Sequence, residues 1–234
     1  MAYSSSGYLY VGDLNRISRY VASTGQYAGW IGMIGASPTG GASGCNGAAV
    51  GTFTPGWCIG GSASSNSGGS GGLKKAKNLH VNDAIGMLYI GDWDQSAVNR
   101  YDLSTGAFRG WIGTIAASPT GAAPGGPSSC VSAPVNSMTP GWCTGGYAKS
   151  GQFRSVMSCA SNGNGKLYVA SFFSSTGGHG GSDLLSIVDE ESGAYIGLHN
   201  SFVGVAQPVS VVPLSDGTVY TLERNGSRFV REMP

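Results

Sequence analysis

The chain has 234 residues, of which 41 are glycine and only 11% are charged, and its formal net charge is +1. This length suits one domain with a sizeable core, and 41% hydrophobic residues are too many for a disordered chain. The near-neutral charge argues against nucleic acid as a partner, and no apolar run reaches the roughly 20 residues that insert across a membrane.

The first two parts of the chain are copies of one unit, and such repeats decide the fold. The segment LYVGD at 9–13 returns as LYIGD at 88–92. The segment TPGWC at 54–58 returns unchanged at 139–143. The chain therefore contains a duplicated structural unit.

Each copy predicts a meander of short antiparallel strands separated by tight turns. In the first copy the predicted strands are 8–11, 16–21 and 26–31. In the second copy they are 77–81, 87–90, 97–103 and 107–112. A more divergent third copy predicts strands at 156–160, 166–171, 184–189 and 194–198, and a partial fourth copy at 209–214, 218–222 and 228–233.

These meanders predict stacked sheets, because residues 9–11 are apolar on both faces of a strand. Four-stranded sheets stacked around an axis form a β-propeller. We predict one all-β domain over 1–234, a β-propeller of about four four-stranded antiparallel blades with long disulfide-stapled loops. The approximate repeats are 1–72, 73–150, 151–205 and 206–234. The first copy has a doubtful opening strand, and the last copy lacks its closing strand. Such ends are expected if the two termini pair and close the propeller into a ring. The alternatives are closure by another chain and a piece of a longer array.

The cysteines form two pairs with the same spacing. Cys45 and Cys58 are 13 residues apart, and so are Cys130 and Cys143, although the second loop is four residues longer upstream. The constant spacing predicts two disulfides, each closing a loop at a gain of about 3 kcal/mol; four buried free thiols are the alternative. Because disulfides persist in oxidising compartments, we predict a secreted or cell-surface protein. Cys159 is left as an unpaired apolar residue in a strand.

Residues 9–20, LYVGDLNRISRY, resemble the consensus of the NHL repeat, in which a Tyr-Val strand precedes Asp, Asn-x-Arg-Ile and an aromatic strand. The match is partial at 98–101 and faint in the last two copies. The resemblance implies an NHL-like propeller over most of the chain. The SPTG and TPGWC inserts instead resemble repeat-rich secreted bacterial surface proteins. A fold resemblance does not by itself assign a function.

Aromatic side chains in the loops are the candidate binding residues. Trp57 and Trp142 each lie in a Pro-Gly-Trp-Cys turn, where a rigid ring could stack on a sugar or enter a partner; the alternative is a ring that folds back as the core of its own loop. The other candidates are Phe53, Trp93, Tyr147 and His179, the last within a glycine-rich loop. Arg19 and Arg100 each precede a tyrosine, and we expect them to stack on a neighbouring aromatic ring.

Three aspartates end equivalent strands and raise the question of a metal. Carboxylates of Asp13, Asp92 and Asp94 could surround calcium at the propeller axis, but the third copy has no aspartate there. We therefore expect these carboxylates to accept backbone hydrogen bonds in turns and to meet Arg16 or Arg100. No cofactor is expected.

Together these patterns predict a non-enzymatic extracellular binding or adhesion module that recognises a cell-surface glycan or protein, as the tip of a surface fibre. Hydrophobic loops repeated at one rim could also join copies of the chain into a homo-oligomer. One alternative is a calcium-dependent propeller lactonase or hydrolase using the three aspartates and His179. Another is a structural repeat that drives self-assembly.

Overall fold

The structure is a computed structural model of the chain, and it describes residues 1–64, 72–172, 184–198, 208–223 and 228–232. Within these residues the regular structure is all strand, apart from one turn of 3-10 helix, η1 (Ser128–Cys130). No helix in the described part of the chain is long and apolar enough to cross a membrane.

The first sheet is an antiparallel meander that gains two strands from its stapled loop. Its meander strands are β1 (Ala2–Ser4), β2 (Tyr8–Asp13), β3 (Arg16–Val21) and β4 (Tyr27–Gly32). The loop adds β7 (Cys58–Ile59) and β6 (Gly40–Gly41) to the outer edge, and it pairs β5 (Ile34–Ala36) with β8 (Ser62–Ala63) separately. Since β1 pairs with β2, the first copy does have an opening strand.

The second sheet repeats this plan. Its meander strands are β9 (Ala76–Asn82), β10 (Met87–Asp92), β11 (Ala97–Asp102) and β12 (Phe108–Ala117). Its stapled loop adds β14 (Cys143–Thr144) and β13 (Gly121–Ala122), and β15 (Tyr147–Lys149) pairs with the far end of β12.

The third and fourth sheets are simpler, with no stapled loop. The third contains β16 (Val156–Ser161), β17 (Lys166–Ser171), β18 (Leu184–Asp189) and β19 (Tyr195–Leu198). The fourth contains β20 (Pro208–Pro213), β21 (Val219–Glu223) and β22 (Arg228–Glu232). The predicted fold class, antiparallel propeller-type blades with disulfide-stapled loops, is confirmed.

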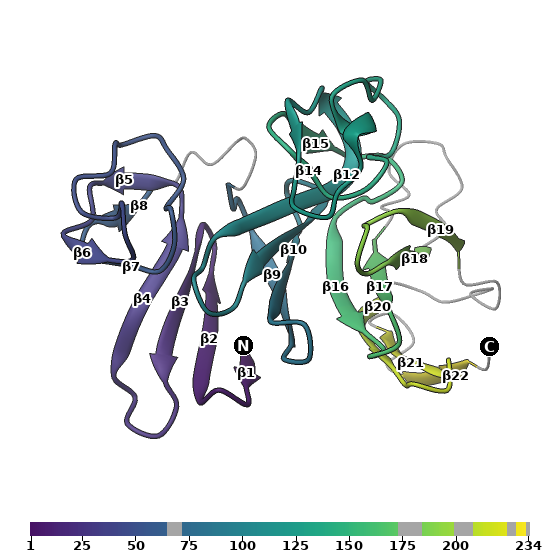
Figure 1. Cartoon of the computed structure of the whole chain (residues 1–234). Coiled ribbons are helices and arrows are strands. Elements are labelled where there is room, and N and C mark those ends of the chain that lie inside the picture. The colour runs from purple at the N-terminus through teal and green to yellow at the C-terminus, as the bar shows by residue number, and fades with distance from the viewer. Residues whose placement is uncertain (65–71, 173–183, 199–207, 224–227, 233–234) are drawn as a thin grey trace.

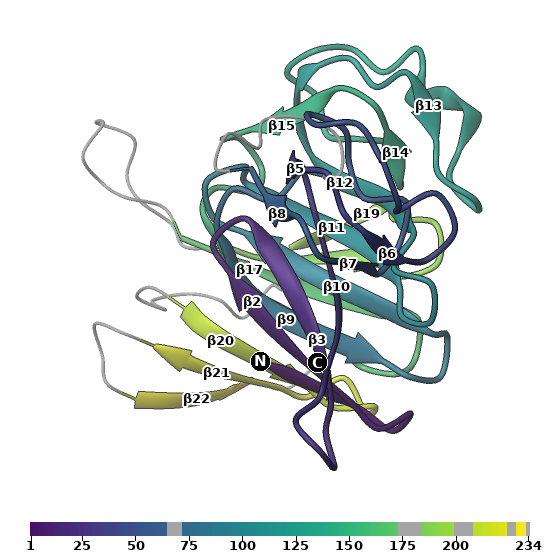
Figure 2. The same cartoon turned by 90° about the vertical axis from the view of Figure 1, so that its left-hand side faces the viewer.

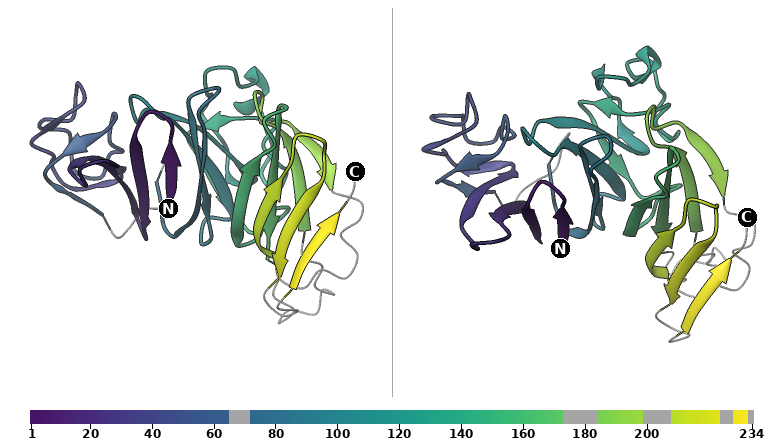
Figure 3. Two further views of the ribbon diagram at one scale, coloured as in Figure 1. Left: turned by 90° about the horizontal axis from the view of Figure 1, so that it is seen from below. Right: turned by 60° about the horizontal axis from the view of Figure 1, so that its bottom comes forward.

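The four sheets stand one behind another in chain order, like the blades of a fan (Figures 1 and 3). Their first strands, β1, β9, β16 and β20, contact one another in that order. In the described residues no strand pairing joins the last sheet to the first, and the two lie at opposite ends of the fan (Figure 3). The described strands therefore form an open array, in which the first and last sheets are not paired.

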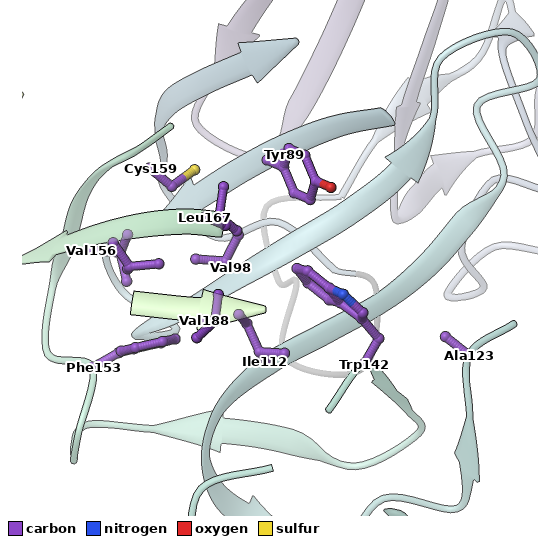
Figure 4. Packing of buried hydrophobic residues seen from close by; sticks show 11 residues of the cluster. Tyr89, Val98, Ile112, Ala123, Trp142, Phe153, Val156, Cys159, Leu167 and Val188 are labelled. Carbon is purple, nitrogen blue, oxygen red and sulfur yellow. The ribbon is translucent and has the colours of Figure 1, made fainter. Parts of the chain in front are cut away.

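The core lies between neighbouring sheets, because each strand of a stacked sheet can bury both of its faces. On β10, Leu88 and Ile90 pack against the first sheet together with Tyr10. Tyr89, between them in the sequence, points to the opposite face, where it belongs to a cluster that includes Val156 of the third sheet (Figure 4). Burial on both faces is what the continuous apolar run at this strand predicts.

The predicted disulfides are both present. Cys45 is bonded to Cys58 and Cys130 to Cys143, with S–S distances of 2.02 and 2.01 Å. Cys159 is a buried free thiol in β16, as expected. The strands of the two stapled loops, β5 to β8 and β13 to β15, lie towards the end of the molecule opposite to β20–β22 (Figure 2).

Candidate functional site

Trp57 lies between the first and second sheets, with only 2% of its surface exposed. Its backbone N–H donates to the carbonyl of Thr105 at 3.0 Å, and its indole Nε1 donates to the carbonyl of Leu103 at 3.0 Å. The Arg19 guanidinium lies 4.5 Å from the ring centroid, and the Tyr10 ring lies 5.5 Å away. The indole thus fastens the first sheet to the β11–β12 turn of the second and has no free face for a ligand.

Trp142 repeats the arrangement between the second and third sheets and is fully buried (Figure 4). Its backbone N–H donates to Ser192 at 2.9 Å and its Nε1 to the Glu190 carbonyl at 3.1 Å, both in the β18–β19 turn. The Arg100 guanidinium lies 4.4 Å from the ring centroid. The predicted stacking of Arg19 and Arg100 on aromatic rings is therefore confirmed. Both tryptophans are buried in contacts between sheets. Their positions match neither the exposed ring of the binding prediction nor the alternative of a ring in the core of its own loop.

The turns that receive the tryptophans require glycine for two reasons. Gly106 and Gly193 have φ angles of +74° and +76°, in the left-handed region that other residues rarely adopt. In addition, a Cβ on Gly106 would lie 2.7 Å from the backbone nitrogen of Trp57, and one on Gly193 would lie 2.7 Å from that of Trp142. A tryptophan can therefore dock closely only on a glycine turn.

Phe53 also bridges two sheets. Its ring stacks on Tyr101 with centroids 5.6 Å apart and lies 6.0 Å from Phe108. Met138 holds the matching position in the second stapled loop and packs against the cluster that contains Val188 of the third sheet. Phe53 is therefore part of the same contact as Trp57.

The remaining predicted residues lie on separate elements. Trp93, which follows β10, is half-buried and stacks on Phe172 with centroids 5.8 Å apart; the ammonium groups of Lys75 and Lys77 each lie 5.8 Å from its ring centroid. Tyr147 lies on β15 and is 49% exposed. His179 lies outside the described residues. The predicted aromatic residues thus do not form one binding surface.

Two of the three predicted aspartates, Asp13 and Asp92, accept backbone hydrogen bonds in their turns, and Asp94 is exposed. Asp13 is exposed, accepts the N–H of Leu14 at 2.8 Å and pairs with Arg16 at 3.8 Å, as predicted. Asp92 is fully buried; burial raises its pKa, although backbone hydrogen bonds oppose this. Its N–H donors are Lys74, Lys75 and Gln95. Asp92 therefore meets the backbone and not Arg100, and among the described residues no cluster of three or more His, Cys, Asp or Glu is placed to hold a metal.

A cleft of about 540 Å³ opens between the second and third sheets. Its polar side chains are Asn82, Arg100, Arg109, Glu190 and Glu191. Its apolar side chains are Ala84, Ile85, Met87 and Pro124, and glycines 125, 163 and 165 complete the wall. A concave site with a mainly apolar lining and a few polar groups is the usual form of a binding site.

The inner end of the cleft is fixed by Glu190, which is only 3% exposed. Its two carboxylate oxygens accept hydrogen bonds from Asn82 Nδ2 at 2.8 Å and from Ser161 Oγ at 2.7 Å. The Ser161 N–H in turn donates to His80 Nε2 at 3.0 Å. Burial lowers the pKa of His80, although the charge of Glu190 opposes this. This network holds the two sheets in register beneath the cleft.

The arginines have different roles in the wall. Arg100 is almost fully buried and donates to the carbonyls of Arg109, Glu191 and Pro124 at 3.1, 3.1 and 3.3 Å. Arg109 is partly exposed and pairs with Asp102 at 3.3 Å. The cleft thus offers a ligand the side chains of Arg109 and Glu191 on a rigid frame.

The repeat pattern does not predict the cleft, although the sequence carries one signal for it. When the repeats are aligned, Glu190 takes the position held by Ala22 in the first copy and by Leu103 in the second. A carboxylate at an otherwise apolar position marks a change of role. Its partners Asn82 and Ser161 come from distant strands and carry no such mark.

No protein-family model matches the chain, and a comparison with curated proteins gives no match. Among solved structures, the chain is similar to Kuenenia stuttgartiensis hydrazine synthase, at 10% identity with a TM-score of 0.48, over 97% of this chain and 46% of that one. It is similar to the RRP9 WD40 repeats at 9% identity with a TM-score of 0.45, over 97% and 48%. For Saccharomyces cerevisiae Sqt1 the values are 10% identity and 0.40, over 94% and 53%. The chain spans about half the length of these structures. Similarity at this level assigns no family, so the NHL resemblance stays a prediction.

Proposed function

We propose that the chain is a non-enzymatic extracellular binding module that recognises a protein partner through the cleft between its second and third sheets. The observation that supports this most is the composition of the cleft. Ile85 and Met87 offer apolar surface next to the charged side chains of Arg109 and Glu191. An apolar centre with a charged rim is the usual anatomy of a protein interface, and the two charges would select a complementary segment.

A protein segment suits this cleft better than a glycan. Sugar recognition relies on an exposed aromatic ring on which the sugar can stack. Trp57 and Trp142 are buried, and the described residues that line the cleft include no aromatic side chain. An extended peptide needs only apolar surface and hydrogen-bonding groups, which this cleft supplies.

The state of the buried acid supports the non-enzymatic role. A catalytic carboxylate needs an oxygen within reach of the substrate. Glu190 is only 3% exposed, and its two oxygens accept hydrogen bonds from Asn82 and Ser161, which favours a role in the frame of the cleft.

The extracellular location is supported by the two disulfides, because such bonds persist in oxidising compartments. The SPTG and TPGWC inserts, which resemble those of repeat-rich secreted bacterial surface proteins, agree with this location. In that setting the array would act as an adhesive tip at a cell surface.

The proposal is tested by selecting ligands and then filling the cleft. The chain is screened against a random linear peptide library and, in parallel, a glycan array. Gly163 lines the cleft with a φ of +74°, and an added Cβ would meet no atom within 4 Å. Asparagine tolerates this backbone conformation, so Gly163→Asn should fold while narrowing the cleft.

We expect selected peptides to bind Gly163→Asn about tenfold or more weakly, since losing one central contact often costs this much. Gly47→Asn is the matched control, because Gly47 also has an open position and a φ of +72° but does not line the cleft. The proposal fails if the peptides bind Gly163→Asn as tightly as the native chain, or if only glycans are selected.

A further inference from the structure

Three turns of the chain share one backbone conformation. Gly25, Gly106 and Gly193 have φ angles of +69°, +74° and +76°. Each donates its N–H to the carbonyl four residues earlier at 2.8 Å. The β3–β4 turn of the first sheet is thus built like the two turns on which tryptophans dock.

The turn of the first sheet is the uncovered member of this set. The tryptophans donate to the backbone of the other two turns, whereas every residue from 22 to 26 is exposed. In those two turns the first and last residues are buried: Leu103 and Gly106 under Trp57, and Glu190 and Gly193 under Trp142. All five tryptophans lie in the described residues, and none docks on this turn. The other three are Trp30 and Trp111, whose indoles donate to Gly60 and Gly145, and Trp93, which stacks on Phe172.

A second part of the docking surface is also repeated on the first sheet. Tyr20 and Tyr27 lie with ring centroids 5.5 Å apart, and the equivalent pair on the second sheet, Tyr101 and Phe108, lies 5.4 Å apart. The second pair is covered by Phe53. On the first sheet the pair has no such cover within the described residues, and Tyr27 is 39% exposed.

The face of the first sheet next to this turn is apolar as well. Leu9 pairs with Tyr20 across the strands, as Leu88 pairs with Tyr101. Leu88 is completely buried by the first sheet, but Leu9 and Val11 are only partly buried. The first sheet therefore presents a copy of the surface by which the second sheet receives its neighbour.

We propose that this face, formed by residues 22–25 with Tyr20, Tyr27, Leu9 and Val11, binds a disulfide-stapled Phe-Thr-Pro-Gly-Trp-Cys loop on another polypeptide. By register with the second sheet, the tryptophan N–H would donate to the Thr24 carbonyl and the indole N–H to the Ala22 carbonyl. The loop's phenylalanine would stack on the tyrosine pair. Both Thr-Pro-Gly-Trp-Cys loops of the present chain are already docked, so the occupant is a loop on another polypeptide. The site joins repeat arrays end to end and is independent of the proposed cleft.

The binding test uses a peptide taken from the chain itself. Residues 45–58, closed by their disulfide, contain both the phenylalanine and the tryptophan of the loop. This peptide is titrated into the isotope-labelled full chain by NMR and, in parallel, by calorimetry. We expect saturable binding with shift changes at residues 20–27, and about tenfold or more weaker binding when the peptide carries Trp57→Ala.

A chain variant tests whether the docking geometry is the one proposed. A Cβ at Gly25 meets no atom within 4 Å in the chain, whereas at the equivalent Gly106 it would lie 2.7 Å from the docked tryptophan nitrogen. Since asparagine accepts a positive φ, Gly25→Asn should fold normally and bind the peptide about tenfold or more weakly, because a central contact is lost.

Gly163→Asn in the cleft is the crossed control and should leave this binding unchanged. The two proposals can therefore fail separately, since Gly25→Asn should not affect ligands of the cleft. Absence of saturable peptide binding up to millimolar concentration would overturn the inference. It would also be overturned if the peptide bound Gly25→Asn as tightly as the native chain, or if shift changes were confined to residues 103–106, where the peptide would only displace the chain's own loop.

Discussion

Asp102 shapes the turn on which Trp57 docks. Its Oδ1 accepts hydrogen bonds from the backbone and hydroxyl groups of Ser104, at 3.1 and 2.7 Å, and of Thr105, at 2.9 and 2.9 Å. Its Oδ2 pairs with Arg109. Partial burial by itself raises the pKa of Asp102, but the hydrogen bonds from Thr105, Ser104 and Arg109 outweigh it and lower the pKa to about 2.

This shift predicts a dependence of stability on pH. The pKa of an unfolded aspartate is about 3.9, so the unfolded chain binds the proton more tightly than the folded chain does. The contribution of Asp102 is therefore complete above about pH 4 and is lost as the pH falls towards about 2. We expect the melting temperature of the native chain to exceed that of Asp102→Asn at about pH 5 and the gap to close by about pH 2.

The measurement is a series of thermal melts followed by circular dichroism across this range. Asp94→Asn, a change at an exposed residue outside the turn, controls for the loss of one negative charge. Parallel curves for the native chain and Asp102→Asn would contradict the assignment.

Residues that recur in both copies predicted the roles of the two arginines but not those of the two tryptophans. The repeat of an arginine before a tyrosine on a strand predicted that Arg19 and Arg100 stack on aromatic rings, and both do. The contacts of Trp57 could not be predicted from its own loop, because its hydrogen-bond acceptors, Leu103 and Thr105, belong to the following sheet. A repeat shows that a residue matters in each unit without showing which unit it contacts.

At the scale of the element, each disulfide holds in place the loop that carries a docked tryptophan. Cys58 directly follows Trp57, and Cys143 directly follows Trp142, so each disulfide ties the docked residue to the start of its own loop. Removing the first staple in a Cys45→Ser/Cys58→Ser variant should therefore weaken both the loop and the contact with the second sheet. A loop of this length is stabilised by about 3 kcal/mol, which corresponds to a melting temperature lower by roughly 6–12 °C in a domain of this size.

Differential scanning calorimetry of the native and staple-free chains gives this shift directly. Cys159→Ala is the control, since it removes a cysteine and leaves both disulfides in place. Burial raises the pKa of the Cys159 thiol to about 12, so this thiol should not exchange with the disulfides in the folded chain. A shift for the staple-free variant no larger than that of Cys159→Ala would show that the staple is dispensable.

The meander strands were predictable, and the loop strands were not. The sequence predicts strands at 166–171 and 184–189, and these are β17 and β18. Both runs are largely apolar and lie beside turn residues, with Asn164 and Gly165 before the first and Ser192 and Gly193 after the second. The strands β6 and β7 have only two residues each and lie among glycines. Their pairing depends on the disulfide and on docking, neither of which leaves an alternating pattern.

At the scale of the molecule, the chain is a one-dimensional array in which each sheet packs on its neighbours in the sequence. The cleft forms at one of these boundaries, where Asn82 bonds to Glu190 across 108 residues of sequence. A cleft between two stacked sheets can be predicted from a sequence only when the order and spacing of the sheets are known. The repeats predicted the sheets themselves, but not the open arrangement or the cleft.

Such an array should respond locally when one boundary is weakened. Trp142→Ala removes a fully buried indole that contacts the second and third sheets, and a change of this kind costs about 3–5 kcal/mol. We expect amide hydrogen exchange, measured by mass spectrometry, to accelerate in β12, β16 and β18 and to stay unchanged in β2 and β3.

Trp57→Ala is the matched variant, because it removes the equivalent indole one boundary earlier. It should accelerate exchange in β4 and β11 while leaving β17 and β18 protected. If instead both variants accelerate exchange equally in all sheets, the molecule opens as one cooperative unit. In that case the tryptophan contacts would stabilise the array as a whole and not the separate joints between its sheets.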